Sequence, residues 1–221
     1  MFERYKNITL QLVQFVNAPR QQNYAQYRNK HLLKEPQEQE LITTGRLLVE
    51  RGLVHATTGE LSLRLETSQL VVNTLGSDLA QLTDQHFVIG ALDNDKVLDD
   101  ATRHLDWHRI IYAKAPAQAV VLCQPPCALT LANAQRLPEQ PVAPEIFQSI
   151  GEVRMIHADE ILAENSTAMF DMHQALLIPG IGALVWGTSL SDVARRAEAL
   201  EYVARLTTLM YQTGLEPNYM E

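Results

Sequence analysis

Two histidines and two cysteines are the side chains whose spacing could support chemistry. His104 and His108 are four residues apart, so on a helix they share one face, where they could act as two metal ligands. Cys123 and Cys127 follow in the next expected strand and turn and could add two thiolate ligands. A metal site built from these four residues is one possibility, and His104 acting alone as a general base is another.

The elements around these residues argue against the four-residue metal site. Residues 102–114 predict a helix that begins with a threonine N-cap, and the apolar run 119–123 predicts a strand that ends before two prolines. Side chains alternate along a strand, so Cys123 points away from the face that carries Leu122 and Gln124. We therefore expect the thiols to be small buried side chains, neither ligands nor nucleophiles.

The rest of the chain predicts strands and helices mixed along one α/β fold. Apolar residues at seven-residue spacing indicate a helix, strict alternation indicates half-buried strands, and a serine–aspartate capping pattern opens the last helix. The strands and helices do not follow a regular βαβ rhythm, so we expect a central, mainly antiparallel sheet flanked by helices. The expected elements are a helix over 39–50, strands over 61–65, 70–72, 175–178 and 183–186, and a helix from Ser189.

Composition limits the function classes. The 221 residues are 46% apolar, enough for one substantial core, and a net charge of -8 with a pI near 5.4 disfavours nucleic acid as a partner. No segment has the roughly 20 apolar residues of a membrane span, and the first residues lack the apolar core of a signal peptide. Two cysteines make no disulfide framework. We expect a cytoplasmic protein with no nucleic-acid or membrane partner.

We expect a single domain overall. Residues 1–38 are interpreted as an N-terminal helix and a polar connector that pack on the main domain, which comprises residues 39–221. Gly214 and the proline after it break helices, so the C-terminal tail is not expected to continue the last helix.

Four blocks of sequence, in register, resemble the class II aldolase/adducin family. They are 45–64, which contains Thr58-Gly59-Glu60-Leu61-Ser62, then His108 to Val121, then Ala175 to Gly182, and finally Trp186 to Leu190, which leads into the last helix. The family includes fuculose-phosphate aldolase and ribulose-phosphate 4-epimerase. The resemblance implies a class II aldolase-like fold, with a central and largely antiparallel sheet flanked by helices.

The resemblance also implies a chemistry and an assembly. Family enzymes hold a divalent metal, usually zinc, which polarises a substrate carbonyl group, and its histidine ligands come from the second and third blocks. A glutamate just before the helix of the second block works as an acid or base. Because family members form tetramers with active sites between subunits, we expect a homo-oligomer, with a tetramer as the first choice and a dimer as the second.

The chain departs from the family at these catalytic positions. The three ligand histidines fall on Leu122, Gln124 and Ile181, and the glutamate falls on His104. Leucine and isoleucine have no ligating atom, whereas a catalytic zinc needs about three protein ligands. We therefore expect no metal and no other cofactor, and Gln124 remains only as a substrate-pocket candidate.

The phosphate pocket that the resemblance implies is altered as well. Its glycine and asparagine fall on Gly59 and Glu60, its second loop keeps Gly76 but loses a hydroxyl, and its serine pair falls on Thr102 and Arg103. These five residues are further pocket candidates. A carboxylate at position 60 repels a substrate phosphate. We expect Arg103 to pair with Glu60, because such a pair accounts for both replacements.

Two functional hypotheses follow from these departures. The favoured one is a family member that is non-catalytic or functionally divergent. The alternative is a metal-independent lyase or isomerase that acts on a small sugar-like or hydroxycarbonyl compound, with His104 as the general base and Arg103 or Gln124 binding an oxygen. The two are distinguished by whether His104, Arg103, Gln124 and Glu60 converge on an open polar site or pair with one another.

Overall fold

The structure is a computed structural model that describes residues 32–65, 68–93, 98–138, 143–163, 169–170 and 173–214. The N-terminal helix expected within residues 1–31 and the tail beyond residue 214 lie outside these ranges. The helices are α2 (Glu35–Glu50), α3 (Leu105–Lys114), α4 (Pro126–Asn133), α5 (Pro144–Ile150) and α7 (Leu190–Thr213), with short 3-10 turns at Leu79–Gln81, Asp84–His86 and Ala158–Glu160. The strands are β1 (Glu60–Leu65), β2 (Gln69–Asn73), β3 (Phe87–Ala91), β4 (Ala119–Cys123), β5 (Glu152–Met155), β6 (His173–Ile178) and β7 (Gly182–Gly187).

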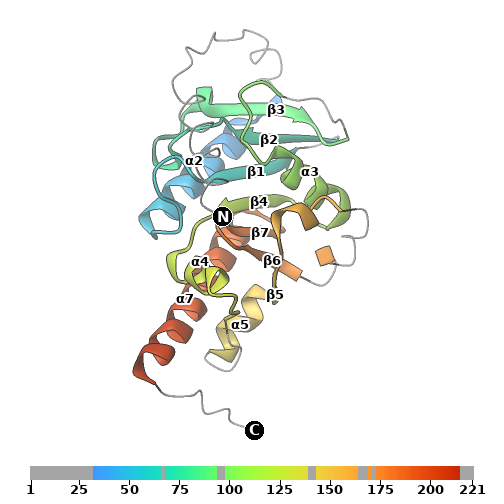
Figure 1. Cartoon of the computed structure of the whole chain (residues 1–221). Coiled ribbons are helices and arrows are strands. Elements are labelled where there is room, and N and C mark those ends of the chain that lie inside the picture. The colour runs from blue at the N-terminus through green and yellow to red at the C-terminus, as the bar shows by residue number, and fades with distance from the viewer. Residues whose placement is uncertain are drawn as a thin grey trace, which may run out of the picture.

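The strands form one seven-stranded sheet in the order β3-β2-β1-β4-β7-β6-β5. Every neighbouring pair is antiparallel except β5 with β6, which is parallel. The expectation of a mainly antiparallel central sheet flanked by helices is therefore confirmed. Strand β4 lies between β1 and β7, so three segments far apart in the sequence lie side by side at the centre of the sheet (Figure 1).

The sheet has a separate apolar layer on each face. One core cluster joins the sheet to α2, α4 and α7, through residues such as Leu41, Leu131 and Leu200. The other joins the opposite face to α3, through Trp107 and Ile111 among others. Figure 1 shows α3 crossing the sheet on the side away from α2. Glu60 begins β1, at the end of the strand that lies nearest the start of α3.

The sequence predicted the long amphipathic elements better than the short ones. The central strands and the last helix are confirmed, including the Ser189 side chain that accepts a hydrogen bond from Asp192 N and the left-handed Gly214 that ends α7. Strands β3 and β5 and helices α4 and α5 were not predicted. Helices α4 and α5 have eight and seven residues, too few for a helical periodicity to stand out.

Two predicted boundaries need correction. Helix α2 starts at Glu35, inside the stretch assigned to the connector, because Pro36 occupies the first helical turn, where a missing N–H has no cost. Helix α3 starts at Leu105 with His104 as its N-cap, so the N-cap is not Thr102. The physical reason for the second shift is the carboxylate of Glu60, which accepts the backbone N–H of His104 at 3.3 Å.

Gly182 is a position where the fold admits no side chain. Its φ is +152°, and a Cβ atom there would lie 2.2 Å from the carbonyl oxygen of Cys123 on the neighbouring strand. Gly180, in the same turn, has a φ of +76° and open space around its Cβ position. We expect Gly182→Ala to lower the free energy of unfolding by about 3 kcal/mol or more, and Gly180→Ala by about 1 kcal/mol. Urea denaturation of both variants checks this, and equal losses would contradict it.

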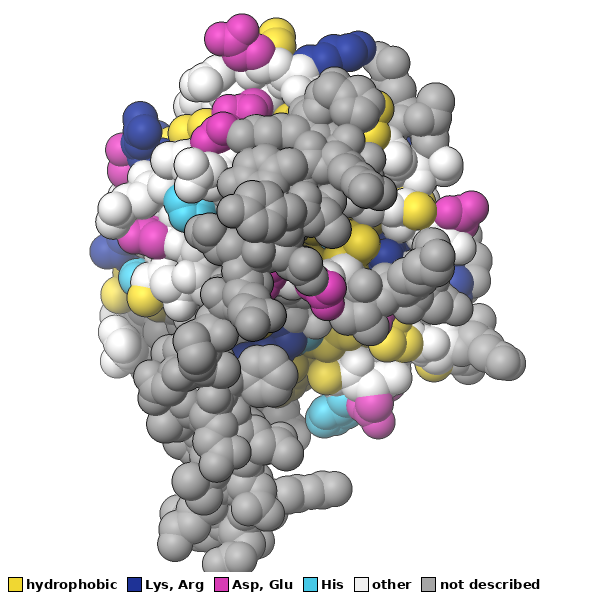
Figure 2. Space-filling model, turned by 90° about the horizontal axis from the view of Figure 1, so that it is seen from above, with side chains coloured by type: hydrophobic (Ala, Val, Ile, Leu, Met, Phe, Trp, Pro, Cys, Tyr) yellow, Lys and Arg dark blue, Asp and Glu magenta, His cyan; other side chains and the backbone are white. Residues whose placement is uncertain are grey.

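The described surface carries charges of both signs. None of the helices in the described ranges combines the length and apolarity that crossing a bilayer requires. Figure 2 shows acidic and basic side chains interspersed on the described part of one face. This mixture agrees with the net charge of -8 and offers no continuous basic area for a phosphate backbone among the described residues of that face.

Candidate functional site

Alternate residues of strand β1 face every fourth residue of helix α3. Two residues of strand span about 6.6 Å and four residues of helix about 6 Å, so the two rows of side chains stay in step. We call this arrangement the strand–helix ladder. It consists of Glu60, Ser62 and Arg64 on the strand, with His104, His108 and Tyr112 on the helix.

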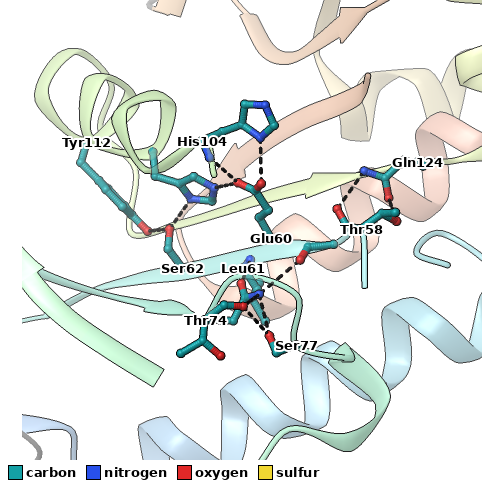
Figure 3. Close-up of polar contacts among 12 residues, drawn as sticks. Thr58, Glu60, Leu61, Ser62, Thr74, Ser77, His104, Tyr112 and Gln124 are labelled. Atoms are coloured by element: carbon teal, nitrogen blue, oxygen red, sulfur yellow. Dashed lines mark hydrogen bonds and ion pairs between the residues drawn. The ribbon is translucent and has the colours of Figure 1, made fainter. Parts of the chain in front are cut away.

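Each contact between the strand row and the helix row is called a rung. The first rung joins the carboxylate of Glu60 to the imidazole of His104. Nδ1 of His104 lies 2.7 Å from Oε1 of Glu60, and the backbone N–H of His104 donates to Oε2 of the same carboxylate at 3.3 Å (Figure 3). The carboxylate therefore lies at the N-terminus of α3, where the helix dipole favours negative charge. Glu60 and His104 form the pair on which the rest of the site depends.

Glu60 is an ionised carboxylate in a nearly buried position. Burial by itself raises its pKa, but the hydrogen bond with His104, the close approach of His108 and the charge of the two imidazoles outweigh burial and lower the pKa to about 2. Nε2 of His108 lies 3.4 Å from Oε2 of Glu60, within ion-pair distance but outside hydrogen-bond geometry. An ionised carboxylate accepts hydrogen bonds and donates none, so the groups that contact Glu60 must be the donors.

Ser62, His108 and Tyr112 are buried, and Arg64 is half-buried. Oγ of Ser62 lies 2.7 Å from Nδ1 of His108 and 2.8 Å from the hydroxyl of Tyr112. Arg64 donates to the backbone carbonyl of Tyr112, and its guanidinium lies 5.3 Å from the centre of that ring. Burial raises the pKa of the Tyr112 hydroxyl far above its usual value, so it stays protonated and can donate.

His104 is the member of the ladder that reaches solvent. Its side chain is 20% exposed, whereas His108 is fully buried. The imidazole stacks on Trp107 with 4.1 Å between ring centres, which limits its rotation. In Figure 3 the ring nitrogen that does not contact Glu60 points away from the carboxylate. With Nδ1 donating to Glu60, the neutral imidazole presents Nε2 as an open acceptor, the arrangement that a general base requires.

Asn73 holds the start of β1 in place. Its amide oxygen accepts Leu61 N–H at 2.7 Å, and its amide nitrogen donates to the carbonyl of Gly59 at 3.2 Å and to Ser77 Oγ at 3.0 Å. A Cβ at Gly59 would lie 2.6 Å from the side chains of Val54 and Leu79. The glycine, a predicted pocket residue, is therefore required for packing beside Glu60.

The predicted pair between Arg103 and Glu60 is wrong. Arg103 is exposed, and Glu60 pairs with His104 and His108. Thr102, also a predicted pocket residue, is buried. Gly76 lies two residues after Thr74, which forms a β-bridge with Ala101. The predicted loop that contains Gly76 and the segment that contains Thr102 therefore meet beside the start of α3. The packing of α3 against β1 determined the partner of Glu60. The two elements are too far apart in the sequence for residue spacing to indicate their register.

Gln124 contacts the loop before β1. Its amide oxygen accepts a hydrogen bond from Thr58 Oγ1 at 2.6 Å, and its amide nitrogen donates to Thr58 O at 3.1 Å. Both ends of the amide are thus used to fasten Thr58, two residues before Glu60. The role of Gln124 in binding a substrate stays a prediction.

The residues at the expected metal position do not fit zinc. Leu122 lies directly across from Glu60 in the sheet and is buried in the apolar layer, and Ile181 packs against the same layer. Neither offers a ligating atom, and the amide of Gln124 is held by Thr58. Within the described residues, no three or more His, Cys, Asp or Glu side chains are arranged to hold a metal ion.

The thiols do not contribute to the site. Cys123 is buried in the apolar layer opposite to the one that contains Leu122, as alternation predicted, and burial raises its pKa well above the usual value. Burial, together with Glu201, raises the pKa of Cys127 to about 11. Thiols that stay protonated at neutral pH are weak nucleophiles and ligands. The four-residue metal site considered from spacing is therefore not formed.

Sequence reasoning missed Ser62, Tyr112, Asn73 and the role of His108. Part of this could have been predicted. Residues 60, 62 and 64 alternate along a strand, residues 104, 108 and 112 recur on one helix face, and all six side chains are polar or aromatic. Matching two such rows predicts a contact, although it does not predict their register.

The chain matches the family described as the Class II Aldolase and Adducin N-terminal domain over residues 39–208. Among curated proteins it is similar to a methylthioribulose-1-phosphate dehydratase of Methylococcus capsulatus, with 28% identity over 80% of this chain and 95% of that protein. It is also similar to a 3-oxo-tetronate 4-phosphate decarboxylase of Pectobacterium atrosepticum, with 24% identity over 77% and 83% of the two chains.

Solved structures share the fold. The L-fuculose-1-phosphate aldolase of Thermus thermophilus matches with a TM-score of 0.72 and 23% identity, over 81% of this chain and 97% of that one. At this identity the likeness concerns the architecture alone. It confirms the arrangement of sheet and helices that the four sequence blocks predicted.

Proposed function

The chain belongs to the class II aldolase and adducin family, and from that membership we propose that it is a metal-independent enzyme. It removes a proton from the carbon beside a carbonyl group in a small, sugar-like hydroxycarbonyl compound. The observation that carries this proposal is the Glu60–His104 pair, which aims one imidazole nitrogen at a buried carboxylate at 2.7 Å and leaves the other open.

The chemistry follows from the orientation of His104. Nε2 accepts the proton from carbon, and the electron pair of the broken C–H bond moves to the carbonyl oxygen to give an enolate. Glu60 compensates the positive charge that the imidazole gains. The enolate then takes a proton back, as an isomerase requires, or expels a group from the next carbon, as a lyase requires.

Arg103 is our candidate for binding the carbonyl or enolate oxygen. It precedes His104 in the chain and is exposed. Glu60 is paired with His104 and His108, so the guanidinium of Arg103 is not used to balance that carboxylate. A cation near the oxygen is needed because the enolate carries the developing negative charge when no metal is bound.

Glu60 pairs with His104 and Gln124 with Thr58, which by itself favours a non-catalytic protein. Two other observations reverse that preference. Two relatives that cover most of this chain are named as a dehydratase and a decarboxylase, which favours an enzyme. A buried carboxylate kept ionised beside a partly exposed histidine is costly to maintain and is typical of catalytic sites. The replaced ligand positions Leu122 and Ile181 still distinguish the chain from a zinc enzyme.

The test is solvent deuterium exchange in the presence of excess chelator. Dihydroxyacetone, ribulose, L-fuculose and their phosphates are incubated with the purified protein in D2O, and exchange at carbon is followed by proton NMR. We expect elemental analysis to find no stoichiometric zinc, and at least one compound to exchange faster than in buffer. Exchange that requires added zinc and is lost in His104→Ala would show a rebuilt metal site. No exchange with any compound, with or without metal, would favour the non-catalytic hypothesis.

A further inference from the structure

The buried rungs of the ladder contain a second histidine that the proposed reaction does not use. His108 is fully buried, and its Nε2 has no hydrogen-bond partner, although Glu60 Oε2 lies 3.4 Å away. Its Nδ1, in contrast, lies 2.7 Å from Ser62 Oγ. A buried imidazole with one nitrogen firmly held and the other aimed at a carboxylate has a defined proton position.

When the His108 ring is neutral, only one placement of hydrogens satisfies every contact. Glu60 is ionised and can only accept, so a hydrogen on Nε2 of His108 faces it favourably. Nδ1 of His108 must then accept the Ser62 hydroxyl hydrogen, and Ser62 in turn accepts from the hydroxyl of Tyr112. The opposite placement points a lone pair of Nε2 at the carboxylate in a buried place, where two facing acceptors are strongly unfavourable.

We infer that His108 is a positioning residue, held by Ser62 and Tyr112 in the Nε2–H tautomer so that it secures Glu60 and thereby the tautomer of His104. In this arrangement Tyr112 donates its hydroxyl hydrogen to Ser62, Ser62 donates to Nδ1 of His108, and the Nε2–H of His108 faces Glu60. With Oε2 directed toward His108, Oε1 is left to accept from Nδ1 of His104 at 2.7 Å. The nitrogen of His104 that faces solvent is then always the unprotonated one in the neutral ring.

The catalytic meaning of this inference rests on the proposed function, but its structural content does not. If His104 is the base, losing the support of His108 lets Glu60 and the imidazole adopt other orientations. We expect His108→Leu to lower the exchange rate constant about tenfold while the KM stays within twofold, since orientation is lost and substrate contacts are not. His108→Gln keeps an amide donor close to the Nε2 position and should restore most of the rate.

The deciding experiment is nitrogen-15 NMR on protein labelled in histidine, which distinguishes donor from acceptor ring nitrogens without any activity assay. In the wild-type protein at neutral pH we expect His108 as Nε2–H and His104 as Nδ1–H. Ser62→Ala removes the donor to Nδ1 of His108 and should raise the share of the Nδ1–H tautomer, which the contact with Glu60 continues to oppose. His173, buried in β6 with Nδ1 3.2 Å from the carbonyl of Glu152, is the internal control and should not change.

The outcomes separate this inference from the proposed function. A wild-type His108 that carries its hydrogen on Nδ1, or tautomers that are unchanged in Ser62→Ala, would overturn the inference, whatever the protein catalyses. The expected tautomers in a protein that exchanges no compound would support the inference and contradict the proposed function. Since Ser62→Ala removes one oxygen, it decides the matter even if His108→Leu fails to fold.

Discussion

Replacing His104 with asparagine is expected to reduce carbonyl-assisted proton exchange by about 10²–10⁴-fold, the range that a positioned general base contributes. The asparagine amide keeps a donor close to Nδ1, so the contact with Oε1 of Glu60 at 2.7 Å in the wild type can persist. What is lost is the second ring nitrogen, which faces away from the carboxylate. The rate constant in D2O with excess chelator measures the effect.

A second histidine near the site provides the control. His55 is exposed and precedes Thr58, whose N–H donates to the carbonyl of His55 at 3.3 Å. His55→Asn should therefore leave the exchange rate within about twofold, because it alters no member of the ladder. If His104→Asn retains the wild-type rate while the protein remains folded, then His104 is not the base and the proposed mechanism is wrong.

Acidification is expected to remove a stabilising contribution of Glu60. Its pKa is lowered from 4.5 to about 2 in the folded protein, because contacts with His104 and His108 outweigh burial. A lowered carboxyl pKa stabilises the folded state above the unfolded pKa, and that stability is lost as the pH falls toward the folded pKa. The loss between pH 4.5 and pH 2 is about 3 kcal/mol, an order-of-magnitude figure.

Urea denaturation at several pH values, compared with Glu60→Gln, isolates this contribution from those of the other carboxylates. We expect the stability difference between wild type and variant to shrink by about 3 kcal/mol across that interval. Glu198→Gln is the matched control, because Glu198 is 46% exposed and forms a surface ion pair with Arg51 at 3.1 Å. Its effect should stay below about 1 kcal/mol. A difference for Glu60→Gln that does not change with pH would contradict the assignment.

Much of the fold could be predicted because the evidence for it is local. Strict alternation over 61–65 and the apolar runs at β4, β6 and β7 are properties of neighbouring residues, and each became a central strand. The order of the four blocks then predicted how these strands assemble. Edge strand β5 and the short helices α4 and α5 have too few residues to show a comparable pattern. The homo-oligomer and the sugar-like ligand stay predictions.

The absence of zinc-ligand chemistry at Leu122 and Ile181 was determined by sequence alone, because a hydrocarbon side chain lacks a donor atom in any conformation. His104 was singled out from the sequence as well, because it occupies the position of the family's glutamate and lies four residues before His108. Its role as a base stays a prediction. The partner of Glu60, in contrast, could not be determined from the sequence. The sequence predicted Arg103, whereas in the structure Glu60 pairs with His104 and His108.

The tertiary structure decided that choice because β1 and α3 meet only after the sheet has formed. Glu60 and His104 are 44 residues apart in the chain, and a shift of one residue along the strand would turn Glu60 to the opposite face. The register of β1 against β4, which places Glu60 across from Leu122, prevents such a shift. The amino-acid sequence thus determined which groups are present, and the packing of strand against helix determined which of them are close enough to act together.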